Sequence, residues 1–81
     1  MPRDMTDHEV EGKSGTVMTR IRGGNLPGEI RVAIRGGTEH FIAFAEQEIQ
    51  RGATVLVFHS RGDRAVDVVP FPEAVGIADS L

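Results

Sequence analysis

The side chains that could perform nucleophilic or metal chemistry are few. Ser14 and Ser60 are candidate nucleophiles, and His8, His40 and His59 are candidate bases. A serine nucleophile needs a base within hydrogen-bond reach, and neither serine lies in a nucleophile-elbow motif. The histidines are widely spaced in no metal-ligand pattern, and the chain has no cysteine. The sequence therefore predicts no catalytic residue, no metal and no cofactor, and we expect that the protein is not an enzyme.

Three further motifs have ordinary structural interpretations. Glu46 and Glu48 form a carboxylate pair, but two positions apart on a helical turn they diverge into solvent. The glycine pairs at 23–24 and 36–37 lack the lysine and helix that follow a phosphate-binding loop, and hairpin turns explain them. A biotin or lipoyl carrier needs a lysine at a hairpin tip, whereas the single lysine, Lys13, precedes the first predicted strand.

Arginines are the most concentrated charged residues. Residues 13–35 hold five basic residues against one acid, so this segment is +4 in a chain whose net charge is −3. Such a cluster fits a solubilising surface, or a docking patch for an acidic partner protein or anionic lipid headgroups. The candidate interaction surface consists of Arg20, Arg22, Arg31 and Arg35.

Single-stranded nucleic acid is an alternative ligand for this surface, because small β-barrels often bind it with arginines and stacking aromatic rings. The chain has four phenylalanines and no tyrosine or tryptophan. Phe58 is expected in the core, which leaves Phe41 or Phe44 to stack on bases. The alternative requires one of these two rings to be exposed beside the arginines.

Alternating apolar and polar residues predict five short strands. In residues 29–35 the alternation is cleanest, with Ile30, Val32 and Ile34 inward. The run 54–59 is nearly all apolar and predicts a strand that is buried on both faces. The predicted strands are residues 14–22, 29–35, 38–44, 54–59 and 65–69.

Residues 45–51 are the helix-friendly stretch, which Gly52 would end, with Ile49 pointing into the core. Five strands with a short helical turn between the third and fourth predict an all-β fold, a five-stranded OB-type Greek-key barrel. The barrel is expected to span residues 13–71, between a flexible N-terminal tail at 1–12 and a C-terminal tail at 72–81.

The distribution of apolar residues indicates where in the cell the protein is expected. No run of 18 apolar residues exists, so no transmembrane helix is predicted, and the acidic N-terminus has no signal-peptide core. A cytoplasmic location follows as the expectation. Met1 followed by a polar tail favours a stand-alone protein over a fragment of a longer one.

The order and spacing of glycines and core residues over residues 12–71 resemble one family. The most specific segment is Ile49-x-x-Gly52-x-x-Val55-x-Val57. The other matching residues are Gly12, Gly15, Leu26, Pro27, Gly28, Glu29, Ile30, Ala43, Gly62, Val66, Val68, Val69 and Pro70. Together they resemble the C-terminal domain of the NfeD-like proteins.

This resemblance implies an OB barrel carried by a membrane protein, in a family often encoded beside flotillin or stomatin-like proteins. Some longer relatives carry a serine protease domain, but this chain has neither such a domain nor a transmembrane segment, so those properties are not carried over. We expect a protein-interaction module, in the cytoplasm or at a membrane through a partner of flotillin or stomatin type. Self-association is an alternative, and so is weak binding of single-stranded nucleic acid.

Overall fold

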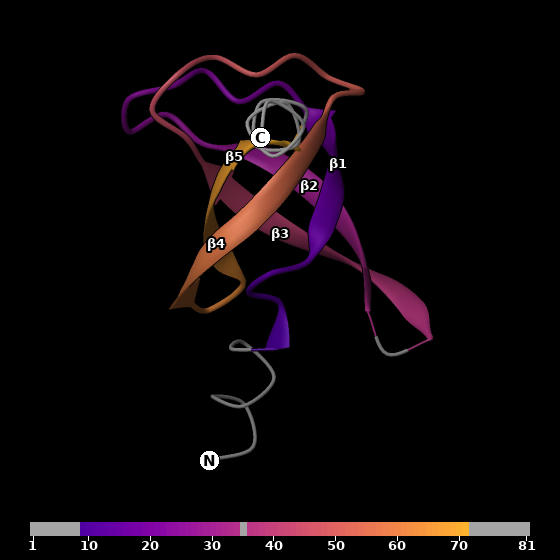
Figure 1. The fold of residues 1–81 in the computed structure, drawn as a ribbon. Coiled ribbons are helices and arrows are strands. Elements are labelled where there is room, and N and C mark those ends of the chain that lie inside the picture. Colours follow the sequence, from indigo (N-terminus) through magenta and orange to yellow (C-terminus); the bar gives the residue numbers. More distant parts are fainter. Residues whose placement is uncertain (1–8, 35, 72–81) are drawn as a thin grey trace, which may run out of the picture.

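The computed structural model describes residues 9–34 and 36–71, and five strands follow one another there (Figure 1). The strands are β1 (Ser14–Thr19), β2 (Gly28–Ile34), β3 (Gly37–Phe44), β4 (Thr54–Gly62) and β5 (Ala65–Pro70). They are neighbours in the order β1-β2-β3-β5-β4, and β4 pairs with β1 to close the barrel. Only β3 and β5 run parallel among these pairs. The predicted five-stranded OB-type barrel is confirmed.

The alternation of apolar residues along the strands builds the core. On β2, Ile30, Val32 and Ile34 are buried while Glu29 and Arg31 face solvent, as predicted. The two faces of the strand differ because the inside of a small barrel is filled by side chains and its outside is wet. The buried apolar side chains are Val10, Val17, Ile21, Ile30, Val32, Ile34, Phe41, Ala43, Ala45, Ile49, Val55, Val57, Val66 and Val68.

Three register shifts interrupt the pairing of the described strands. The pairing of β1 with β2 shifts between Val17 and Thr19, and the pairing of β4 with β5 shifts between Val57 and His59 and again between Ser60 and Gly62. A bulge places one extra residue in a strand, so the residues beside it turn to the same side. At the β4 bulge, Phe58 and His59 both point outward before Ser60 turns in again.

The burial of β4 on both faces was a wrong prediction. Val55 and Val57 are fully buried, but Leu56 is only partly buried and Phe58 is 57% exposed. A strand of a closed barrel has one inner face, so a run of four apolar residues cannot all enter the core. Thr19 is exposed beside the β1 shift, although its alternation with Val17 and Ile21 would place it on the inner face.

No helix lies between β3 and β4, so the predicted helical turn is absent. Residues 45–53 instead form an irregular connection across the end of the barrel, beside the connection from β1 to β2 (Figure 1). Ile49 and Ile21 exchange both backbone hydrogen bonds, at 2.8 and 3.0 Å, and both side chains are buried. This pairing satisfies the peptide groups without a helix, and it places Ile49 in the core as predicted.

Residues 9–12 pack on the other end of the barrel. Val10 is fully buried, and the Gly12 N–H donates to the Val57 carbonyl at 2.7 Å. The contacts of the barrel therefore begin ahead of the boundary expected after Gly12. Residues 1–8 and the expected C-terminal tail at 72–81 lie outside the described part of the chain.

Candidate functional site

An open groove of about 570 Å³ lies on the outer surface where β3, β5 and β4 meet. Its strand residues are Phe44, Phe58, Arg61, Asp67, Val68, Val69 and Pro70. Residues 24–25 and 45–47 of the two paired connections form its remaining wall. We call this site the aromatic groove. It depends on the connections, because the Gly24 N–H donates to the Glu46 carbonyl at 3.2 Å and holds the two segments together.

Phe58 is the most exposed ring of the groove, at 57% of its surface. Its position follows from the β4 bulge, where Val57 pairs with Val68 and His59 pairs with Asp67, so Phe58 has no partner of its own. Bulges often aim a side chain that regular pairing would place elsewhere. The bulge thus presents a large apolar side chain to solvent at the rim of a groove.

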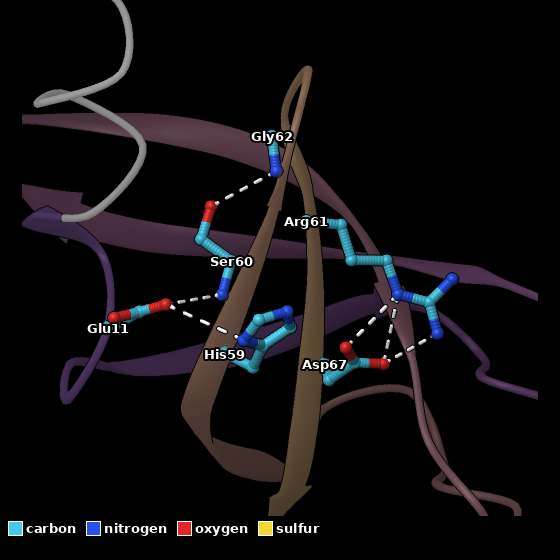
Figure 2. Close-up of polar contacts among 6 residues, drawn as sticks. All are labelled: Glu11, His59, Ser60, Arg61, Gly62 and Asp67. Carbon is cyan, nitrogen blue, oxygen red and sulfur yellow. Dashed lines mark hydrogen bonds and ion pairs between the residues drawn. The ribbon is translucent and has the colours of Figure 1, made fainter.

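Phe44 forms the opposite part of the groove and is covered by an arginine. The Arg61 guanidinium lies over the Phe44 ring, 3.8 Å from its centroid. Figure 2 shows how Asp67 holds this guanidinium: both carboxylate oxygens accept from Nε at 3.1 Å, and Oδ1 also accepts from Nη2 at 2.7 Å. The hydrogen bonds with Asp67, more than its charge, raise the pKa of Arg61 above the ordinary arginine value. The wall of the groove is therefore fixed before any ligand arrives.

The second polar cluster joins the N-terminal segment to β4 (Figure 2). The Glu11 carboxylate accepts from the Ser60 backbone N–H at 2.8 Å and lies 3.8 Å from His59 Nδ1. The Ser60 hydroxyl oxygen accepts from the Gly62 N–H at 3.3 Å. Glu11 thus contacts the Ser60 backbone rather than its hydroxyl, which is the reverse of what a serine nucleophile needs. The cluster ties residues 9–12 to the barrel.

The structure places three of the four predicted arginines. Arg20, Arg22 and Arg31 are all exposed, and Arg35 lies outside the described residues. Arg20 forms an ion pair with Glu48 at 3.3 Å. Arg31 lies opposite Thr16 on β1, and Arg20 follows Thr16 by four residues, or roughly 13 Å along an extended chain. Arg20 and Arg31 are therefore separated along the strand direction and are not brought together at a point.

The exposure of the phenylalanine rings tests the alternative that this barrel binds single-stranded nucleic acid. Phe41 is 3% exposed, with the Arg64 guanidinium 5.2 Å from its ring centroid. Phe44 is partly buried, on the outer face that carries Arg61 rather than beside the predicted arginines. The ring that does face solvent is Phe58, which was expected in the core. Phe58 lies on β4 and Arg31 on β2, and these two strands are not neighbours in the barrel.

Sequence reasoning missed Phe58, Arg61 and Asp67 as site residues. Arg61 and Asp67 are six positions apart in the chain, and only the hairpin between β4 and β5 brings them into contact. A signal for Phe58 was available, because a strand in a small barrel has one wet face and the run Val55 to Phe58 must expose part of itself.

Within residues 9–34 and 36–71, no group of three histidine, aspartate or glutamate side chains is arranged to hold a metal ion. The same residues contain no helix of the length and apolar character that crossing a membrane would require. The fold and the groove define a small OB-type barrel whose distinctive surface is aromatic.

The comparisons with known proteins identify the family. The NfeD C-terminal domain model matches residues 14–69, well over half of the chain, so the chain belongs to the NfeD C-terminal domain family. The solution structure of the soluble domain of the NfeD protein YuaF from Bacillus subtilis is similar, with a TM-score of 0.70 and 29% identity. That match covers 86% of this chain and 82% of the other. No curated protein matches the chain.

Proposed function

We propose that this barrel is a non-enzymatic protein-interaction module that docks on a membrane-associated scaffold of flotillin or stomatin type, in the cytoplasm. The observation that supports it is the exposure of Phe58, 57% of whose surface is open beside the aromatic groove. Apolar side chains grouped around a groove commonly mark sites for protein partners. The partner class rests on the family, whose members are often encoded beside such scaffolds.

The polar groups around the groove favour binding over chemistry. Arg61 and Asp67 are bonded to each other, and Ser60 is buried with its hydroxyl bonded to the Gly62 N–H. The Ser60 hydroxyl accepts from a backbone N–H, and this contact does not draw a proton from it. A nucleophile without a base has no means of activation at neutral pH.

The exposed arginines remain a proposed second contact with the scaffold. Arg22 and Arg31 face solvent, and a basic side of the barrel would complement an acidic partner or a negatively charged membrane surface. The double variant Arg31→Glu with Arg35→Glu is expected to abolish capture of the scaffold while the barrel stays folded. Unchanged capture would remove the arginines from the proposal.

The proposal is tested by immobilising the full chain and identifying the proteins that it retains from detergent-solubilised membranes. Wild type is expected to retain a scaffold of flotillin or stomatin type, and Phe58→Ser to lose retention by about tenfold or more, as for an interface hot spot. Met18→Ser is the matched control, because Met18 is also apolar, exposed and at a bulge, but lies outside the groove. Equal retention by all three, or retention of no such scaffold, would overturn the proposal.

A further inference from the structure

The aromatic groove carries an unbalanced negative charge. Its ionisable residues are Glu46, Arg61 and Asp67, which sum to −1. Arg61 and Asp67 form an ion pair at 2.7 Å and neutralise each other. Within the described part of the chain, Glu46 forms no ion pair, and its side chain is exposed. The groove therefore attracts a cation beside its apolar surface.

An edge of β5 borders the same groove. The parallel pairing with β3 ends at Phe44 and Asp67, whereas β5 continues to Pro70, so among the described residues no strand pairs with this edge of β5 from Val68 onward. Val68, Val69 and Pro70 all line the groove. Pro70 lines the groove and has no N–H, so it brings no backbone donor to it. An unpaired strand edge and Glu46 together favour an extended ligand that brings donors and positive charge.

We infer that the aromatic groove binds an extended segment of a partner protein in which an apolar side chain is flanked by basic residues. The apolar side chain would lie against Phe58 and Phe44, and an ammonium or guanidinium group would pair with Glu46. Arg61 covers one side of the Phe44 ring and is held by Asp67, so the groove needs little rearrangement to bind. This inference rests on the proposed function, and it names the chemistry of the partner at that site.

The negative charge of the groove disfavours three other possible ligands. Residues 72–81 of this chain follow Phe71 directly and carry apolar side chains, but they hold Glu73 and Asp79 and no basic residue. A second copy of the chain brings a net charge of −3. Nucleic acid brings a phosphate on every nucleotide. All three carry the same sign of charge as the groove, whereas a basic segment carries the opposite sign.

The inference is tested with two capped synthetic octapeptides, one with a leucine between lysines and one with glutamates in place of the lysines. Each is titrated into the ¹⁵N-labelled full chain while amide shifts are followed by NMR. The lysine peptide is expected to shift the amides of residues 24–25, 45–47 and 68–69, with the weak affinity of a short peptide in an open groove. Glu46→Gln is expected to weaken binding about two- to fivefold, as for an exposed ion pair. Glu48→Gln is the matched control, since Glu48 pairs with Arg20 outside the groove.

Three results would overturn the inference. The two peptides could bind with equal affinity, the lysine peptide could shift only amides outside the groove, or Glu46→Gln and Glu48→Gln could have the same effect on peptide affinity. Shifts of the groove amides on removal of residues 72–81 would instead assign the groove to that segment. Concentration-dependent shifts without peptide would assign it to a second copy. If Phe58→Ser abolishes scaffold capture while neither peptide binds, the inference fails and the proposed function stands.

Discussion

The two sides of this barrel differ in how they are built. On the β1–β2 side, Arg31 extends from a regular position of β2, and Arg20 and Arg22 extend from the connection that follows β1. On the β3–β5–β4 side, the aromatic groove combines a bulge, a hairpin ion pair and two paired connections. The first surface follows from local sequence, whereas the second exists only when distant segments meet. Defined recognition is expected on the second side, because its side chains are held by one another.

The β1–β2 side depends on a close approach of backbones at Gly28, and this gives the largest expected effect. A Cβ at Gly28 would overlap the carbonyl oxygens of Thr19 and Arg20 and the Ile21 side chain. Gly28→Ala is expected to lower the free energy of unfolding by about 3 kcal/mol, measured by urea denaturation. Gly37→Ala is the control, because a Cβ there meets nothing, and it should change stability by at most about 1 kcal/mol. Similar losses in both variants would show that the two strands do not pack this closely.

The β4 bulge predicts opposite behaviour for two adjacent apolar residues. Val57 is fully buried and Phe58 is 57% exposed. Val57→Ala should lower the free energy of unfolding by about 2 kcal/mol, from lost burial and the cavity left behind. Phe58→Ala should change it by less than about 0.5 kcal/mol, although it removes the larger side chain. Urea denaturation of the two variants decides the point, and a larger loss for Phe58 would place that ring in the core and remove the groove.

The strands and most of the core could be predicted from the sequence, because period-two alternation is a local property. Ile30, Val32 and Ile34 follow it without interruption, and Val66 and Val68 do so on β5. The bulges could not be predicted, since an extra residue is decided by the partner strand. Neither could the irregular path of residues 45–53, whose local preference for a helix loses to the backbone pairing of Ile49 with Ile21. The groove is made of these two non-local features, and for this reason sequence reasoning did not find it.

The smallest expected effect concerns the arginines of the β1–β2 side. Arg20 and Glu48 form an exposed ion pair, whereas no ion pair is recorded for Arg31 within residues 9–34 and 36–71. A double-mutant cycle with Arg20→Ala and Glu48→Ala should give a coupling of about 0.3 kcal/mol at low salt, and none in 0.5 M salt. Arg31→Ala should leave the unfolding free energy within about 0.5 kcal/mol of wild type. A larger loss at Arg31 would mean that this side chain stabilises the barrel. A negligible loss would mean that its charge is available to a partner, so that any loss of scaffold capture in the arginine variants reports on binding and not on folding.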